Sequence, residues 1–444
     1  MDYLESWKRV RRWLLRGYAA LMLLQGASTL RSLAPGVIPT IQPRPPAPGM
    51  RRDQAGQHTH AVSRLAVSII VPARDEADNI APCLHSLLTQ HLANGAENGV
   101  EVIAVDDAST DGTGDILEAL ARGAPGQLQV IHLRETPPGW AGKPNALHNG
   151  AQQARGTWLL LTDADTRWQP GAVEALVAFA EAHQVDLLTT FPRQILASPL
   201  ERVAAPELVA TLFAFTSPVA VNSPRRRDAA LANGQCILLR RAVYEAIGGF
   251  DRPEMRGVIL DDAALAAAVK RAGYRLQVSA GQDLLTVRMY PSAHAAWQGW
   301  LRNITASYHT HSWHVSTLGL LGFTTYHLTP YGLTLSGLLC WRRARHADET
   351  LVIGTLALGV SLFSYGRALR ALCLPWKLLF THPISVTLEQ ALLTQGWWRF
   401  IRGRPIVWKR RAYTPGHTYQ QAPNGQASAA DAYVGSSASA DTPC

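Results

Sequence analysis

Two aspartates separated by a single residue have the spacing of a metal site. Asp163 and Asp165 follow the apolar run at residues 158–161, which is expected to be buried. Two carboxylates this close repel each other unless a cation lies between them. Hard divalent ions such as Mg²⁺ and Mn²⁺ prefer oxygen ligands, and such an ion can bridge a diphosphate and neutralise its charge. We therefore predict that Asp163 and Asp165 bind Mg²⁺ or Mn²⁺.

Acidic residues also follow two earlier apolar runs, the first at residues 67–72 and the second beginning at residue 100. In an open parallel sheet, ligands bind in the crevice at the carboxyl ends of the strands. The acids at these two ends are candidates for the same ligand site: Asp75, Glu76, Asp106 and Asp107. The next acids, Asp111 and Asp115, are expected instead to cap a helix, because Asp is favoured there.

Apolar runs of strand length alternate with helical stretches through the middle of the chain. Between the first two runs, apolar residues from Ile80 to Leu88 fall on one helical face, and Asp78 or Asn79 is placed to cap that helix. The runs recur roughly every 25 to 35 residues, the size of a strand-helix-strand unit. This pattern predicts an α/β fold with a mostly parallel sheet covered by helices on both faces. The runs are residues 67–72, 100–106, 128–133, 158–162 and 185–190.

The composition excludes a disordered chain and favours a membrane surface over nucleic acid. The chain has 444 residues, of which 47% are hydrophobic and 17% charged, and its net charge is +9; soluble domains carry about 25% charged residues. Anionic lipid attracts short basic runs, so membrane lipids are predicted partners and nucleic acid is not. The cysteines are scattered without zinc or disulfide spacing, which favours a reducing cytoplasm. The basic runs are residues 8–12, 225–227, 342–343 and 409–411.

Apolar segments towards both ends of the chain predict membrane attachment. Residues 17–30 are too few to cross a hydrocarbon core, which takes about 20 helical residues, so they form an interfacial anchor or a degenerate span. Residues 315–340 and 350–366 contain no Lys, Arg, Asp or Glu and predict transmembrane helices. Prolines and charges interrupt residues 371–393, which indicates a re-entrant or interfacial element. The arginines of the loop 341–349 oppose the positive-inside tendency, so the topology stays open.

These features divide the chain into six segments. The stretch after the first apolar segment is rich in Pro, Gly, Gln and Arg and is expected to be a linker. The Ala-, Ser- and Gly-rich end is expected to be disordered. The predicted boundaries are 1–33 for an N-terminal membrane anchor or interfacial helix, 34–64 for the linker, 65–290 for the α/β domain, 291–314 for a juxtamembrane segment, 315–413 for transmembrane and interfacial helices, and 414–444 for the tail.

Several motifs, in order along the chain, resemble those of the family 2 glycosyltransferases of the GT-A fold. The resemblance implies that residues 65–290 form a Rossmann-like GT-A catalytic domain. Within the family, two segments resemble the members that glycosylate carotenoids and the related hopanoid-associated enzymes, namely residues 137–147 and 407–413. The general motifs are the first strand and nucleotide loop at 67–80, the uracil-contacting motif at 105–113, and the DxD metal motif at Asp163-Ala164-Asp165.

The resemblance implies roles for the acidic residues and for Lys143. Lys143 would lie near the donor phosphates; the alternative is a solvated loop lysine, which Gly139 and Gly142 make weaker because glycine permits close approach to a ligand. Arg302 is a further donor candidate, since an arginine fork suits diphosphate oxygens. The implied donor-binding residues are Pro72, Asp75, Glu76, Asp106, Asp107, Lys143, Asp163 and Arg302, and the metal ligands are Asp163 and Asp165.

Sugar transfer to a hydroxyl needs a base that removes the proton, and the resemblance points to Asp262. Residues 259–262 match the Glu-Asp motif of the family, with Asp261 in place of Glu. Asp262 is therefore the expected catalytic base, and the nucleotide diphosphate would be displaced in one inverting step. The alternative is that both aspartates only begin a helix, where negative charge is favourable.

Two further segments are expected on the acceptor side of the site, namely residues 232–236 and 297–303. A tight turn is an equally good interpretation of Asn233-Gly234, and Trp297 fits an interfacial aromatic belt. The Gln-x-x-Arg-Trp signature of processive polysaccharide synthases is missing around Trp300, which argues against processivity. The acceptor-binding candidates are Asn233, Gly234, Gln235, Asp261 and Trp300.

Together these features predict a membrane-attached, metal-dependent, inverting glycosyltransferase. It would pass a hexose from a nucleotide-diphosphate sugar, such as UDP-glucose, to a lipophilic acceptor such as a carotenoid or hopanoid. The predicted location is the cell (inner) membrane with the catalytic domain in the cytoplasm, where nucleotide sugars are made. The alternatives are a polyprenyl-phosphate sugar transferase or polysaccharide synthase, and a non-catalytic nucleotide-sugar-binding membrane subunit. His309, His311 and His314 do not share one helical face, so no further metal site is expected there.

Overall fold

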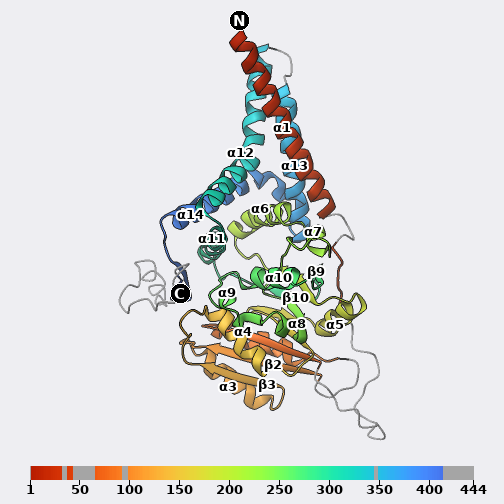
Figure 1. Ribbon diagram of the computed structural model, residues 1–444, viewed down its shortest axis with the longest axis vertical. Coiled ribbons are helices and arrows are strands. Elements are labelled where there is room, and N and C mark those ends of the chain that lie inside the picture. Colours follow the sequence, from red (N-terminus) through yellow and green to blue (C-terminus); the bar gives the residue numbers. More distant parts are fainter. Residues whose placement is uncertain (1, 33–37, 44–65, 93–98, 345–348, 414–444) are drawn as a thin grey trace, which may run out of the picture.

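The computed structural model describes residues 2–32, 38–43, 66–92, 99–344 and 349–413. It has two parts, a sheet-containing domain and a group of long helices that extends away from it (Figure 1). The N-terminus lies at the far end of the helical part (Figure 1). The predicted tail and most of the predicted linker lie outside the described residues.

A mostly parallel sheet of seven strands forms the centre of the domain, which confirms the predicted architecture. The strand order is β3-β2-β1-β4-β8-β6-β9. Only β8 runs antiparallel to its neighbours, β4 and β6, and the remaining neighbouring pairs are parallel. The strands are β1 (Val67–Ala73), β2 (Val100–Asp107), β3 (Leu128–Leu133), β4 (Trp158–Leu161), β6 (Leu187–Phe191), β8 (Ile237–Arg240) and β9 (Leu276–Ala280).

Helices cover both faces of this sheet, and successive strand residues enter two separate cores. In β1, Ile69 packs into one core and Ile70 into the other, as the two-residue period of a strand requires. Residues of α2, α3 and α5 belong to the first core, and residues of α4 and α10 to the second. The helices of the domain are α2 (Ala77–Leu88), α3 (Thr113–Gly123), α4 (Gly142–Gln153), α5 (Ala172–Ala182), α8 (Arg241–Ala246), α9 (Pro253–Arg256) and α10 (Asp261–Arg271), with the 3₁₀ turn η1 (Gly249–Asp251).

Two small sheets lie beside the main one. The first is formed by β5 (Thr166–Trp168), β10 (Leu285–Val287) and β7 (Arg193–Gln194). Because β5 begins one residue after Asp165, it fixes the end of the Asp163–Asp165 turn. The second is the C-terminal hairpin of β11 (Ile406–Trp408) and β12 (Arg411–Tyr413), which returns the chain from the helices to the sheet-containing domain.

The helical part includes an insertion into the sheet-containing domain. Helix α6 lies between β7 and β8 in the chain and contacts α13 and α14. Helix α1 lies along α13, and α12 packs against both α13 and α14 (Figure 1). The helices of this part are α1 (Asp2–Ser32), α6 (Pro199–Phe215), α7 (Pro218–Asn222), α11 (Ala293–His309), α12 (Trp313–Ala344), α13 (Glu349–Ala371) and α14 (His382–Ile401), with the 3₁₀ turn η2 (Trp376–Thr381).

Among the described residues, α13 alone is long and apolar enough to cross a membrane, with a mean hydropathy of 1.4. It contains the predicted span 350–366. The other predicted span, 315–340, lies in α12, a helix of 32 residues with Pro330 inside it. The predicted re-entrant element forms η2 and the first half of α14. The prediction of several C-terminal transmembrane helices is therefore supported for α13 and stays a prediction for the others.

Candidate active site

One pocket of about 560 Å³ opens at the carboxyl ends of β1, β2 and β4. Helix α11 and the β11–β12 hairpin complete its wall. Most of the predicted site residues line this pocket, whereas Asp75, Asp106 and Trp300 do not. The predicted residues that line it are Pro72, Glu76, Asp107, Lys143, Asp163, Asp165, Asn233, Gly234, Gln235, Asp261, Asp262 and Arg302.

Lys143 lies among the pocket carboxylates rather than in solvent. Its Nζ is 2.7 Å from Asp163 Oδ1 and 3.5 Å from Asp261 Oδ2. Burial lowers the pKa of Lys143, but the charges of Asp163, Asp261 and Asp262 raise it by a larger amount. The net shift of the pKa is upward, so the ammonium group stays charged. The position of Lys143 in the first turn of α4 therefore places a permanent positive charge in the pocket.

Asp165 has the properties of a metal ligand. Its Oδ1 is buried and has no hydrogen-bond partner. Burial, followed by the charges of Asp163 and Glu76, raises the pKa of Asp165 to about 7. An unpaired buried carboxylate is costly, and a divalent ion held by oxygen ligands removes that cost. The residues present therefore fit the predicted Mg²⁺ or Mn²⁺ site.

The two aspartates at the start of α10 have different environments. Asp262 Oδ2 accepts a hydrogen bond from the Gly234 N–H at 3.1 Å, and its Oδ1 accepts one from the Ala263 N–H at 2.8 Å. Burial raises the pKa of Asp262, and it raises that of Asp261 to about 6. Both residues begin a helix, as the structural alternative required, but both also line the pocket, so the two interpretations hold together.

The segment Asn233–Gln235 is both a tight turn and part of the pocket wall. The Cys236 N–H donates to the Asn233 carbonyl at 3.0 Å, which closes the turn. A Cβ at Gly234 would lie 2.9 Å from Lys143 Nζ, so a side chain there would displace the lysine. Glycine at this position therefore permits the close approach of the turn to Lys143.

Asp75 and Asp106 join two loops together instead of facing the pocket. Asp75 has a φ of +49°, and its Oδ1 accepts a hydrogen bond from the Thr110 N–H at 2.8 Å. Asp106 accepts one from the Ser109 N–H at 3.0 Å and also contacts His132 Nδ1 at 3.0 Å. Both carboxylates are thus used within the loops that follow β1 and β2, and they position Glu76 and Asp107 beside the pocket.

The C-terminal hairpin supplies cations that sequence reasoning assigned to lipid. Lys409 Nζ forms an ion pair with Glu76 and donates to the Asp75 carbonyl at 3.1 Å. Arg411 forms a buried ion pair with Asp107. Two members of the basic run 409–411 therefore face the acids predicted to bind the donor, and the hairpin is part of this site.

Arg302 lies in the pocket wall contributed by α11. Its guanidinium is 5.6 Å from the centre of the Trp408 ring, and burial lowers its pKa. Trp300, two residues earlier, packs edge-on against Tyr290 at 5.9 Å between ring centres. Tyr290 lines the pocket and Trp300 does not, so Trp300 supports the predicted acceptor side from behind.

Apart from Arg302, the pocket residues that come from α11 and from the segment before it were not singled out from the sequence. They include Met289, Tyr290, Gln298 and Asn303. Gln298 and Arg302 are four residues apart in α11 and therefore share a helical face. This spacing was the available signal, but an amphipathic helix beside apolar segments is equally typical of a membrane surface.

Residues 68–248 match the family model described as Glycosyl transferase family 2. The match is to the same family that the motifs of this segment predicted. The chain is also 26% identical over 262 residues to the 4,4'-diaponeurosporenoate glycosyltransferase of Staphylococcus aureus strain USA300 and 27% identical to that of strain MRSA252. Each match covers 57% of this chain and 65% of the relative, which is slightly less than two thirds of the relative's length.

Solved structures with some likeness to this chain include a mannosyltransferase and a protein in complex with UDP. The mannosyltransferase PcManGT from Pyrobaculum calidifontis, in complex with GDP-Man and Mn²⁺, is 19% identical, with a TM-score of 0.49 and coverage of 87% of this chain and 99% of its own. The chain of S. aureus TarS 1-349 in complex with UDP is 17% identical, with a TM-score of 0.38 and coverage of 81% and 97%.

Proposed function

We propose that this protein transfers a hexose from a nucleotide-diphosphate sugar, UDP-glucose in the first instance, to a lipophilic acceptor with inversion at the sugar carbon. The observation that supports this most strongly is the sharing of one pocket by Lys143 and the aspartates 163, 165, 261 and 262. The mostly parallel sheet that holds them supports a GT-A arrangement of residues 65–290.

Asp163 and Asp165 would hold the divalent ion. When bound, Mg²⁺ or Mn²⁺ supplies positive charge against the donor diphosphate. Lys143 and Arg302 add permanent positive charge in the same pocket, which favours the diphosphate as a leaving group because charge on it increases as the bond breaks.

Asp262 is the proposed base. The acceptor hydroxyl oxygen attacks the anomeric carbon, its proton passes to an Asp262 oxygen, and the bond from that carbon to the diphosphate oxygen breaks. The hydrogen bond from Gly234 N–H holds the carboxylate in place. Its raised pKa makes it a stronger base than an ordinary aspartate, which suits proton transfer near neutral pH.

The donor site is proposed to include the hairpin. Glu76 and Asp107 are paired with Lys409 and Arg411, so a nucleoside that uses these acids must share them with the hairpin or displace its side chains. The hairpin would therefore position the nucleotide loops as well as enclose the donor.

The acceptor is proposed to reach the pocket from a membrane. Helix α13 meets the length and composition criteria for a span, and apolar side chains such as Leu318, Leu321 and Leu356 are exposed on α12 and α13. The similar proteins of S. aureus carry a carotenoid acid in their name, which supports a carotenoid or hopanoid acceptor. Attachment to the inner membrane with the domain in the cytoplasm would bring a soluble donor and a lipid acceptor together.

Membranes containing the protein, incubated with labelled UDP-glucose and a carotenoid and hopanoid extract, test this proposal. We expect label in the lipid fraction when Mn²⁺ is present and none after chelation. A matched Asp262→Asn sample should bind donor and transfer no label. The experiment is repeated with other labelled sugar nucleotides. Label that stays in the aqueous phase with UDP-glucose and with all of these donors would contradict the proposal.

A further inference from the structure

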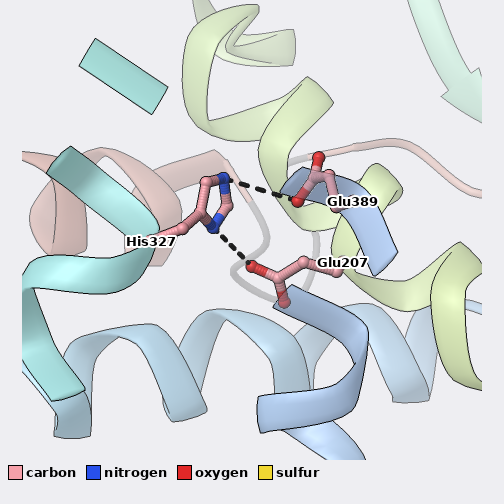
Figure 2. Close-up of side chains that lie close together, drawn as sticks. All are labelled: Glu207, His327 and Glu389. Carbon is pink, nitrogen blue, oxygen red and sulfur yellow. Dashed lines mark ion pairs between the residues drawn. The ribbon is translucent and has the colours of Figure 1, made fainter. Parts of the chain in front are cut away.

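Three helices of the helical part converge on a buried set of ionisable side chains, which we name the helical cluster. It consists of Glu207 from α6, His327 from α12 and Glu389 from α14 (Figure 2). Their exposed fractions are 2%, 0% and 1%. None of the three lines the pocket described above, so the helical cluster is a separate feature.

The ligand atoms of the helical cluster are close together. His327 Nδ1 is 3.2 Å from Glu207 Oε1, and His327 Nε2 is 3.4 Å from Glu389 Oε2. One ligand atom can be taken from each residue so that all three lie within 4.8 Å of one another. Neighbouring ligands of a tetrahedral zinc ion with bonds of about 2.1 Å are separated by about 3.4 Å. The two contacts reach different nitrogens of one ring, and a single ion binds only one of them, so the 4.8 Å limit is the relevant spacing. A rotation of the glutamate side chains would bring the three ligand atoms to the spacing of a metal site.

Two atoms of the helical cluster have no hydrogen bond although they are buried. They are Glu207 Oε2 and His327 Nδ1. Buried polar side-chain atoms in folded proteins nearly always have a partner, and an exception calls for an unseen water, an ion or a functional reason. Both atoms are in ion-pair contact, His327 Nδ1 with Glu207 and Glu207 Oε2 with His382, but without hydrogen-bond geometry. A bound ion would give them the partner that these contacts do not fully provide.

A cation would also balance the charge of the helical cluster. Within the residues that the structure describes, the ion-pair partners of Glu207 and Glu389 are imidazoles only: His327 contacts both, and His382 Nε2 lies 3.4 Å from Glu207 Oε2. With neutral imidazoles, two buried carboxylates would carry two uncompensated negative charges, which is strongly unfavourable. Either an imidazole or a carboxyl group is protonated, or a divalent cation is bound.

We propose that Glu207, His327 and Glu389 bind one divalent transition-metal ion, such as Zn²⁺ or Mn²⁺. One imidazole nitrogen and two carboxylates form a mixed nitrogen and oxygen ligand set that such ions accept. Thr211, whose hydroxyl donates to Glu389 Oε2 at 3.1 Å, and His382 would orient the ligating carboxylates, as outer hydrogen-bond partners do in metal sites.

The competing arrangement is a protonated His327 between the two carboxylates. Figure 2 shows that the glutamates approach opposite nitrogens of the ring. An ion that takes all three ligands would use one of these nitrogens, and the farther glutamate would rotate about its terminal torsion, which has a broad energy profile. The two arrangements differ in whether a metal is present.

Such an ion would hold together helices from separate segments of the chain. Helix α6 lies between β7 and β8 in the sequence, whereas α12 and α14 follow the last strand of the main sheet. Because the three helices come from separate segments, an ion bound between them is present only in the folded state, and its binding energy stabilises that state.

Metal content of the purified full-length protein tests the proposal. The protein is incubated with ZnCl₂ or MnCl₂, passed over a desalting column and measured by mass spectrometry of the metals. We expect about one tightly held ion per chain. The double variant Asp163→Asn and Asp165→Asn should keep this ion. The metal content of Glu389→Gln and of His327→Gln should be at least about tenfold lower than that of the wild-type chain. Glu349→Gln, in the exposed first turn of α13, is the matched control and should keep it.

A second measurement protects the test from variants that fail to fold. Co²⁺ bound to the wild-type chain through nitrogen and oxygen ligands should give visible absorption bands, which Zn²⁺ abolishes by competition. A wild-type chain that retains no ion and gives no Co²⁺ bands overturns the proposal in favour of the protonated His327. An ion that folded Glu389→Gln and His327→Gln proteins retain in full also overturns it.

Discussion

The pocket and the helical cluster contain the same kinds of side chain in opposite surroundings. In the pocket, the side chains of Asp163 and Lys143 are 29% and 20% exposed, and the lysine supplies a positive charge. In the helical cluster, no side chain is more than 3% exposed and the partners of the glutamates are imidazoles. The pocket can therefore exchange ligands with solvent, whereas the helical cluster is closed.

A site that does chemistry therefore differs from a set of charges that affects only stability in its access to solvent and substrate, rather than in its number of carboxylates. A group that takes a proton from a substrate must be reached by that substrate, and Asp262 is in a pocket. A sealed set of charges acts only through the free energy of the folded state. The predictions below separate the two roles by measuring activity and stability side by side.

The largest effect is expected for Asp262→Asn. The amide cannot accept the acceptor proton, so the turnover rate should fall by about 10³-fold, while the melting temperature changes little. Transfer of labelled sugar and thermal unfolding are measured on the same preparation.

Asp262→Glu is the matched control for charge, since it keeps a carboxylate but moves it. Partial activity in Asp262→Glu together with loss in Asp262→Asn would support the base. Equal turnover of Asp262→Asn and the wild-type chain would exclude it.

The opposite result is expected for Glu389→Gln. Breaking a buried charge pair by removing one partner costs about 3 kcal/mol of stability, so the melting temperature should fall clearly while the donor affinity of the remaining folded protein stays the same. Thermal unfolding followed by circular dichroism checks the first part. Glu349→Gln, whose side chain pairs with Arg16 near the surface, should change the melting temperature much less; an equal loss would remove the distinction between the two positions.

The central sheet was predictable because each apolar run became a strand. The runs that begin near residues 67, 100, 128 and 158 correspond to β1, β2, β3 and β4. The strands are buried on both faces, so their sequences are continuously apolar and successive side chains enter alternate cores. The antiparallel strand β8 was not predicted, because strand direction depends on pairing between distant segments rather than on local pattern.

The pocket was more predictable than the helical cluster for a related reason. Asp163 and Asp165 are neighbours in sequence, and the rule for the carboxyl ends of strands brings Asp107 towards them. Glu207, His327 and Glu389 are single polar residues in three distant helices, so no spacing relates them. Attention to the nearby histidines 309, 311 and 314 could not find His327. The pairing of Lys409 and Arg411 with Glu76 and Asp107 was missed because it also joins distant segments.

Lys143→Met should reduce activity by about 10²-fold, because a charge that stabilises the developing diphosphate is lost. It should also move the pH profile. Asp262 is active when deprotonated, so the rate falls as the pH decreases through its raised pKa. Lys143 lowers the pKa of Asp262, and removing its charge should shift this acid limb to higher pH. Lys143→Arg keeps the charge and should leave the limb in place; an unchanged limb in Lys143→Met would contradict the coupling.

Arg411→Gln should weaken donor binding by about tenfold without abolishing turnover. Its ion pair with Asp107 is buried, so its loss leaves Asp107 without its charged partner, and charged hydrogen bonds contribute about 1.5 to 3 kcal/mol. Calorimetric titration with UDP-glucose measures the change. Arg410→Gln is the matched control, because the Arg410 side chain is mostly exposed and its contact with Asp75 is long, at 3.7 Å. Tighter donor binding in Arg411→Gln would instead mean that the hairpin competes with the donor for Asp107.

The smallest effect is expected at His132, whose side chain is more exposed than those of the pocket and of the helical cluster. Its ring contacts Glu118 at 2.9 Å and Asp106 at 3.0 Å, and its side chain is 43% exposed. The hydrogen bonds to Glu118 and Asp106 raise the pKa of His132. A raised folded-state pKa means that the contribution to stability is present below the unfolded-state pKa of about 6.5 and is lost as the pH rises through the folded-state value. Solvent screening limits this contribution to about 0.5 kcal/mol, so His132→Gln should lower the melting temperature slightly at pH 6 and not at pH 9. A larger loss at pH 9 than at pH 6 would show that the ring acts by packing rather than by charge. Exposure of the charged groups would then not explain the different effects expected at the pocket, the helical cluster and His132.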